Sequence, residues 1–304
     1  MVTEMFQNLR TTFDARIANV SWMNTTTKTA ARGKLAAMGE KIAYPDRWQD
    51  YAGLNLSESY IGNVRAVAAY NLVHGPSGLD KIGGPVDRSA WYMSPQTVNA
   101  YYNPTMNEII FPAAILQFPV FDPDADPAVN YGGLGFVIGH EMTHGFDNAG
   151  RQYDKDGNLR DWWTSEDTTR FNNLTGQLVT QYNTYEILPG LYSNGNLTLG
   201  ENIADFGGLT LAYHAWKSTD IRSADGGLAD TTRDREFFYS AARIWRQNVR
   251  EEALRNQVYT DPHTTARYRV NGVLFNIPEF YEAFPEIQPG DALYRNASER
   301  PVIW

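Results

Sequence analysis

The chain has 304 residues, which is enough for one large domain or two smaller ones. Its formal net charge of -9 argues against a surface for nucleic acids or anionic membranes. It contains no cysteine, which excludes disulfides and thiolate metal sites and leaves histidine, aspartate and glutamate as the available metal ligands. No apolar run approaches the ~18 residues of a membrane span. The N-terminal stretch 1–22 lacks the pattern of a signal peptide.

Helical spacing of apolar residues dominates the first quarter of the chain. It predicts two helices within residues 1–42 and a third over residues 56–74. The following region is richer in aromatic and β-branched residues. These predict short strands at 91–93, 98–102 and 107–112. We expect the strands to form a small sheet beside the apolar helix that follows.

Three aspartates alternate just before that helix, at Asp122, Asp124 and Asp126. Carboxylates at this spacing can hold calcium, but Pro127 stands where a calcium-binding loop needs glycine. A solvated loop is therefore the preferred interpretation, and a calcium site is the alternative.

The strongest chemical pattern is H-E-x-x-H at residues 140–144. Residues i and i+4 of a helix lie one above the other, so His140 and His144 can share one zinc ion. Glu141 stands beside them, where it can accept a proton from water. The alternative is a chance match on a core helix. Gly135 and Gly139 lower helix propensity, so we expect them to permit close packing.

The rest of the chain is predicted to be largely helical. The periodic stretches cover residues 165–185, 199–218, 233–256 and 278–284. A charged, glycine-containing stretch over 218–234 links two of them. No long Pro/Gly/Ser linker is visible in the sequence, which favours one compact unit.

A third metal ligand has to come from elsewhere in the chain. Asp147 and Gly150 occupy the later positions of the three-histidine zinc pattern, which excludes that type. Glu201 and Asp205 lie one helical turn apart, so one carboxylate can bind the metal while the other holds a ligand histidine. Thr198 and Glu201 also match a capping box, in which Glu201 only closes the start of a helix. Spacing alone leaves both interpretations open.

Short motifs spread along the chain carry a family resemblance. They are N-A-Y-Y (99–102), A-I-L-Q (114–117), V-I-G-H-E-M-T-H-G-F-D (137–147), G-E-N-I-A-D (200–205), D-P-H (261–263), R-V-N-G (269–272) and the closing V-I-W (302–304). Together they resemble the neprilysin family of zinc metallopeptidases, whose bacterial members include the PepO-type oligopeptidases. The likeness extends from about residue 5 to the C-terminus.

The resemblance implies a chemical role for each matching residue. The family's zinc ligands are matched by His140, His144 and Glu201. Glu141 matches the general base. Asp205 and Asp147 match carboxylates that orient the ligand histidines, and His263 matches the group that stabilises the oxyanion.

The resemblance also implies substrate contacts. Asn99, Ala100 and Arg269 match residues that hold the substrate backbone. The apolar pocket for the residue after the scissile bond is matched by Ile115, Val137, Ile244 and Trp245. Arg267 lies two residues before Arg269 on an expected strand, where both could face one side, and spacing from His263 favours Arg269.

The fold implied by the resemblance is α+β, mainly α: a thermolysin-like zincin (gluzincin) catalytic domain with a small sheet beside the zinc helix. We expect residues 1–304 to form this single domain, with residues 1–55 as a helical segment packed on it. Family members are more than twice as long and carry a large helical lid domain, which this chain is expected to lack.

The implied function is a zinc-dependent endopeptidase with one Zn²⁺ per chain that cuts on the amino side of hydrophobic residues. Its expected substrates are peptides or unfolded proteins, and an open cleft would admit larger proteins. The alternative is a catalytically inactive zinc-binding module or a fragment of a longer peptidase. Glu141 and His263 favour the enzyme, because a binding module needs neither. The compartment (bacterial cytoplasm or secreted) and the oligomeric state stay open.

Overall fold

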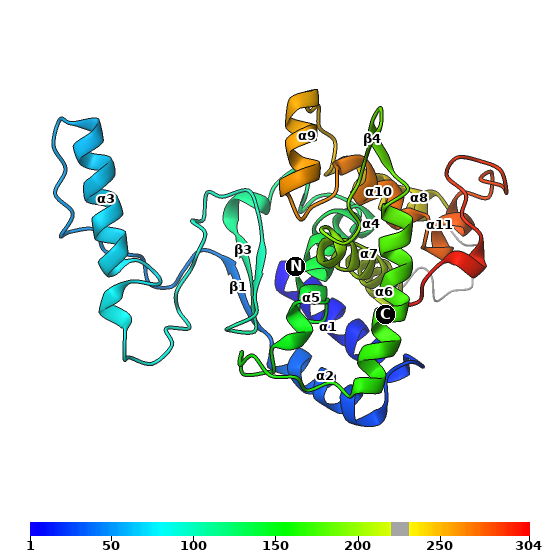
Figure 1. Ribbon diagram of the computed structural model, residues 1–304, viewed down its shortest axis with the longest axis horizontal. Coiled ribbons are helices and arrows are strands. Elements are labelled where there is room, and N and C mark those ends of the chain that lie inside the picture. The colour runs from blue at the N-terminus through cyan, green and yellow to red at the C-terminus, as the bar shows by residue number, and fades with distance from the viewer. Residues whose placement is uncertain (220–230) are drawn as a thin grey trace.

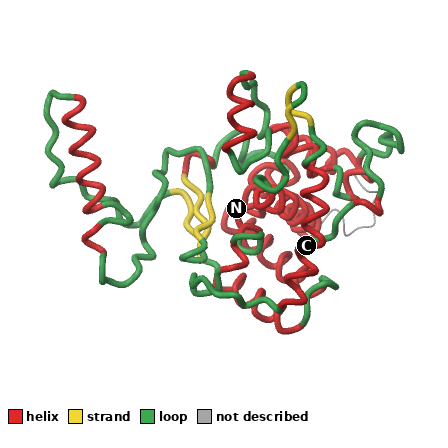
Figure 2. The backbone as a smooth tube through the Cα atoms, viewed as in Figure 1, coloured by secondary structure: helices red, strands yellow, loops and turns green. Residues whose placement is uncertain are grey.

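The structure is a computed structural model that describes residues 1–219 and 231–304. Over these residues it is mainly helical, with a three-stranded sheet and a two-stranded hairpin (Figures 1 and 2). The helices are α1 (Val2–Asn19), α2 (Thr25–Ala37), α3 (Tyr60–His74), α4 (Pro127–Asn130), α5 (Phe136–His144), α6 (Ser165–Tyr182), α7 (Leu199–Thr219), α8 (Thr231–Arg243), α9 (Glu251–Thr260), α10 (Ala266–Leu274) and α11 (Pro278–Ala283). The strands are β1 (Gly39–Ala43), β2 (Tyr101–Asn103), β3 (Glu108–Pro112), β4 (Glu186–Leu188) and β5 (Leu191–Tyr192). The predicted fold class is confirmed. In the described residues no helix is both long and apolar enough to cross a membrane.

The first two helices form one side of the main body. The apolar face of α1 is buried against α2, α5 and α7. Asn24 caps α2 by accepting a hydrogen bond from the Thr27 backbone N–H. The prediction of helix as far as residue 42 is wrong, because α2 ends at Ala37 and the next residues pair with β3 as strand β1.

The small sheet has the order β1-β3-β2. Strand β3 is fully buried in the centre and pairs in parallel with β1 and antiparallel with β2. The predicted strand at 91–93 is wrong, because Tyr92 donates its backbone N–H to the Tyr101 hydroxyl instead of joining a strand ladder. The sheet therefore presents β2 as an edge strand.

Helices α5 and α7 cross at two glycines near the centre of the body. A Cβ atom added at Gly139 would lie 2.6 Å from the Gly208 carbonyl oxygen, and one added at Gly208 would lie 2.5 Å from the His140 backbone nitrogen. The expected close packing at Gly139 is confirmed. The two helices meet backbone to backbone, which sets the distance between His140 on α5 and Glu201 on α7.

Two predictions in the C-terminal part are wrong. Residues 233–256 do not form one helix, because the chain leaves the helix after Arg243 and α9 begins at Glu251. Arg267 and Arg269 lie on helix α10 and not on a strand. The predicted link over 218–234 lies largely outside the described residues, which resume at Thr231. The chain ends inside the core, where the Trp304 ring packs against Phe13.

The three alternating aspartates lie in a turn before α4. Asp126 accepts a hydrogen bond from the Ala128 N–H at the start of α4, and its carboxylate also pairs with Arg233 at 2.7 Å. Asp122 accepts a bond from the Asp124 N–H. These local roles agree with the loop interpretation.

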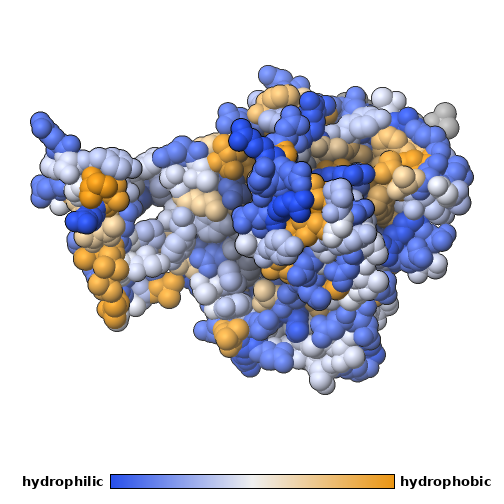
Figure 3. Space-filling model, turned by 45° about the horizontal axis from the view of Figure 1, so that its top comes forward, coloured by the Kyte–Doolittle hydropathy of each residue, from blue (hydrophilic) through white to orange (hydrophobic). Residues whose placement is uncertain are grey.

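Residues 44–98 form an arm that extends away from the body and carries α3 (Figure 1). No residue of α3 is buried. More than half of the exposed large apolar side chains among the described residues lie on this arm, and they gather along it at the left of Figure 3. The arm enters and leaves the body beside the sheet, after β1 and before β2.

Candidate active site

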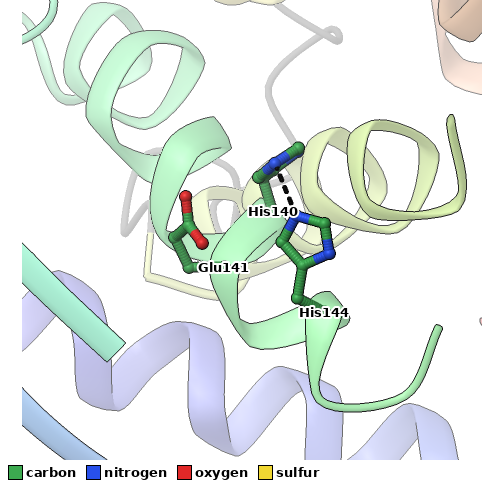
Figure 4. A group of neighbouring side chains, drawn as sticks. All are labelled: His140, Glu141 and His144. Atoms are coloured by element: carbon green, nitrogen blue, oxygen red, sulfur yellow. Dashed lines mark hydrogen bonds between the residues drawn. The ribbon is translucent and has the colours of Figure 1, made fainter. Parts of the chain in front are cut away.

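The two histidines of the H-E-x-x-H pattern face each other on α5. Their Nε2 atoms lie 3.0 Å apart, and the ring planes are inclined at 87° (Figure 4). Glu141 lies to one side of the pair, and ligand atoms of His140, Glu141 and His144 all lie within 4.8 Å of one another. Helical spacing therefore brings the three side chains together as the sequence predicts.

Each imidazole is held from behind by a carboxylate. Asp205 Oδ1 lies 2.8 Å from His140 Nδ1, and Asp147 Oδ2 lies 2.7 Å from His144 Nδ1. An Nδ1–H that donates to a carboxylate leaves the Nε2 lone pair as the free acceptor. Two lone pairs aimed at one point repel unless a proton or a metal ion lies between them, so the pair can share the hydrogen bond drawn in Figure 4 or bind a metal ion.

Negative groups dominate the surroundings of these rings. Burial alone would lower the pKa of His144, but its hydrogen bond to Asp147 and the nearby Glu201 carboxylate raise it well above its ordinary value. Burial likewise opposes a charge on His140, while Asp205 raises the pKa of that ring. The same negative field that favours a proton here favours a divalent cation.

Glu201 on α7 supplies a further carboxylate to the histidine pair. Its oxygens lie 3.3 Å from His140 Nε2 and 3.6 Å from His144 Nε2. Tetrahedral zinc ligands with bonds of about 2.0–2.1 Å are roughly 3.3 Å apart. The three distances here are close to that value, although the two to Glu201 are made by different oxygens. Glu201 Oε2 is buried and makes no hydrogen bond of good geometry, although the Nε2 atoms of His140 and His263 lie 3.3 and 3.2 Å from it; such an oxygen is suited to a cation.

The capping-box alternative for Glu201 predicts a different geometry. In a capping box the Glu201 side chain would accept from the Thr198 backbone N–H. Here the Thr198 N–H donates to the Asn194 carbonyl, and the Thr198 hydroxyl accepts from Asn202 Nδ2 at 2.8 Å. The Glu201 carboxylate instead faces the histidines, which supports the ligand interpretation.

Arg269 forms a buried ion pair behind His140. Its Nε and Nη2 atoms donate to the two oxygens of Asp205 at 2.8 and 2.7 Å, and its guanidinium lies 3.9 Å from the centre of the Trp245 ring. Burial alone would raise the pKa of Asp205, but the Arg269 charge and His140 lower it. Asp205 therefore stays ionised and keeps His140 oriented.

His263 lies in the loop between α9 and α10. Its Nε2 is 3.2 Å from Glu201 Oε2, and its Nδ1 is 2.7 Å from Asp261 Oδ1. The side chain is 42% exposed. The Glu201 carboxylate raises the pKa of His263, which favours a ring that carries a donor proton on Nε2.

A cavity of about 640 Å³ opens beside these groups. Every site residue that the sequence predicts lines it. Besides the groups named above, these are Asn99, Ala100, Ile115, Val137, Ile244 and Trp245. Val120 and Phe136 also line it and were not predicted, because an apolar residue carries no sequence signal that separates a cavity wall from a core.

The fold and the site together define a class of protein: a zincin-type metallopeptidase domain, mainly helical, with the H-E-x-x-H helix beside a small sheet. A sequence model of peptidase family M13 matches residues 99–300, and a second model described as peptidase family M13 matches residues 1–45. The chain belongs to peptidase family M13.

Known proteins are similar in sequence to this chain along nearly its whole length. Neprilysin-3 of Drosophila melanogaster is 39% identical over 99% of the chain, which covers 39% of that protein. The neutral endopeptidase of Lactobacillus helveticus is 36% identical over 100% of the chain, which covers 45% of that protein. The chain thus spans less than half the length of these relatives.

Two solved structures show the same fold. The Mycobacterium tuberculosis zinc metalloprotease Zmp1, in complex with an inhibitor, superimposes with a TM-score of 0.92 at 42% identity, over 100% of this chain and 47% of that one. PepO from Lactobacillus rhamnosis superimposes with a TM-score of 0.87 at 34% identity, over 100% and 46% of the two chains.

Proposed function

We propose that residues 1–304 form the catalytic part of a zinc endopeptidase. The observation that carries the proposal is the pair of imidazole Nε2 atoms 3.0 Å apart, each ring backed by a carboxylate, at the wall of a substrate-sized cavity. Family membership supports zinc as the metal.

One Zn²⁺ per chain would be held by His140, His144 and Glu201. When bound, it would supply a Lewis acid that polarises the scissile carbonyl and lowers the pKa of water. Asp205 and Asp147 hold the two ligand rings in the tautomer that presents Nε2.

Glu141 is the proposed general base. Burial raises the pKa of Glu141, which makes its carboxylate a better proton acceptor near neutral pH. It takes a proton from the attacking water and then passes it to the leaving amine. His263 donates its Nε2–H to the oxyanion that develops on the carbonyl oxygen.

The substrate would lie along the edge strand β2 as an added strand. Asn99 and Ala100 directly precede β2 and would hold the substrate backbone, together with Arg269. Arg269 also binds Asp205, so it would serve both the substrate and the His140 ligand. Ile115, Val137, Ile244 and Trp245 would accept an apolar side chain after the scissile bond.

A peptide-cleavage assay tests this function. We expect zinc-loaded protein to cut peptides on the amino side of Phe or Leu at least tenfold faster than matched peptides with Asp there, because the predicted pocket is apolar. Removal of zinc with a chelator should abolish cleavage, and added zinc should restore it. Unfolded casein tests whether the cleft also admits larger chains.

The alternative is an inactive zinc-binding module or a fragment that needs the rest of a longer peptidase. The share of the relatives that the chain covers is the observation that favours it. Stoichiometric zinc binding without cleavage of any peptide would support this alternative and reject an active enzyme.

Replacing Glu201 with alanine tests the ligand set. Loss of a residue that only supports a metal ligand typically raises the Kd for the metal about 10–100-fold. Because Glu201 is a proposed ligand itself, we expect its loss to raise the Kd for zinc by at least that factor. Metal analysis after dialysis against a zinc buffer measures the change. If zinc content stays the same and only the melting temperature falls, Glu201 is a helix cap.

A further inference from the structure

Lys34 of α2 is a charged side chain in the core. It is 1% exposed, and its Nζ donates to the carbonyl oxygens of Gly145, Gly150 and Tyr153, each at 2.7 Å. Three acceptors match the three N–H donors of an ammonium group. In the described part of the chain no carboxylate lies within ion-pair distance of it, so the three carbonyls are its direct partners. Burial lowers the pKa of Lys34 to about 7, while the charges of Asp147 and Asp154 oppose that shift.

The three carbonyls belong to the loop that follows α5. This loop, residues 145–153, folds tightly onto the helix end: a Cβ atom at Gly150 would lie 1.7 Å from the His144 carbonyl oxygen. Within it, Asp147 accepts bonds from the Ala149 and Gly150 N–H groups through Oδ1 and contacts His144 through Oδ2. The loop therefore links two contacts: its backbone carbonyls accept from Lys34, and its Asp147 carboxylate contacts the ring of His144, a proposed metal ligand.

Aromatic rings surround the same ammonium group. Tyr102, Phe146 and Trp162 have ring centres 5.8, 5.6 and 5.8 Å from Lys34 Nζ. Tyr102 lies on β2 and lines the cavity. The Lys34 backbone carbonyl also accepts from Asn107 Nδ2, just before β3. Helix α2 thus connects the loop after α5 with the sheet that borders the cavity.

We propose that Lys34 is a positioning residue: it fixes the 145–153 loop so that Asp147 holds His144 in the orientation that binds the metal. It touches neither the substrate nor the metal. The proposal rests on the zinc site of the proposed function. Because three bonds and the surrounding rings act on a nine-residue loop, loss of the ammonium group would let Asp147 move relative to His144.

The test is the zinc affinity of Lys34→Met in the full chain, measured by competition with a chelating zinc indicator. Methionine keeps an unbranched apolar stem among the rings but cannot donate to the carbonyls. We expect the Kd for zinc to rise about tenfold or more, as for other partners outside the ligand set. Lys28→Met is the matched control, because Lys28 lies on the same helix and its Nζ donates to the Ala18 carbonyl and not to the 145–153 loop. It should leave the Kd unchanged.

A double-variant cycle separates positioning from general stabilisation. If Lys34 acts through Asp147, Lys34→Met and Asp147→Asn will weaken zinc binding less together than the product of their separate effects. A purely structural role would lower the melting temperature of the metal-free protein and leave the Kd of the folded protein unchanged, which would overturn the proposal. The proposal would also be overturned if the double variant raised the Kd for zinc by the full product of the two separate factors.

A second variant covers the case in which Lys34→Met does not fold. Lys34→Gln retains two N–H donors but no charge, so folded Lys34→Gln should bind zinc with a Kd above that of the parent by a measurable factor. A Kd equal to the parent's in folded Lys34→Gln rejects the role of the ammonium group. If the parent chain itself binds no zinc, the proposed function fails, which is a distinct result.

Discussion

Glu141→Gln is expected to lower kcat for peptide cleavage by about 10²–10⁴-fold while zinc binding is retained. The Glu141 side chain is buried beside the histidine pair, and in the proposed function its carboxylate takes a proton from the attacking water. Glutamine has nearly the same shape and cannot accept that proton. Single-turnover cleavage of a peptide at saturating zinc, with metal analysis of the same sample, measures both quantities.

Glu4→Gln is the control for this substitution, because Glu4 is exposed on α1, away from the cavity lining. It should leave both cleavage and zinc content unchanged. A Glu141→Gln protein with parental kcat would remove Glu141 as the base. Loss of zinc together with activity would instead indicate that Glu141 is the third ligand, an arrangement that its distance to the histidines permits.

Gly208→Ala is expected to destabilise the fold by about 3 kcal/mol, at the upper end of ordinary overpacking. The new Cβ would lie 2.5 Å from the His140 nitrogen and 2.8 Å from its Cα, and both of these are backbone atoms that cannot turn aside. Helices α5 and α7 must therefore separate, which also moves Glu201 away from His140. Urea unfolding of the metal-free protein measures the loss of stability.

Gly176→Ala on α6 is the matched control. An added Cβ there meets nothing within 4 Å, so the substitution should stabilise the protein by about 0.5–1 kcal/mol through helix propensity. Equal stability of Gly208→Ala and the parent would contradict the backbone contact between the two helices.

Local sequence patterns predicted the parts of the site that lie on one helix. The i,i+4 spacing of His140 and His144 is enough to make their rings meet, and a glycine in an apolar helix is enough to indicate close approach. For Glu201 the pattern matched a ligand and a cap equally well. Only the direction of its side chain toward the histidines favours one of them, and the roles of all site residues stay predictions until they are tested.

The errors arise where distant partners override local periodicity. Residues 39–43 continue a helical pattern but form β1, because β3 offers a row of backbone partners. The helix expected through 256 breaks after Arg243, and Trp245 turns to cover Arg269. Nothing in the local sequence indicates that Lys34 is buried, because its three carbonyl acceptors lie more than a hundred residues away.

The arm connects β1 with β2, the two outer strands of the sheet, and both of these strands pair with the central strand β3. The entropy lost in closing a loop rises only with the logarithm of its length, so a longer or shorter arm changes the equilibrium stability of the sheet by a few tenths of a kcal/mol per modest change in length. We therefore expect insertions and deletions in the arm to leave strand β2 and helices α5 and α7 in place. The surface that the arm presents can then change in evolution without a change in the candidate active site.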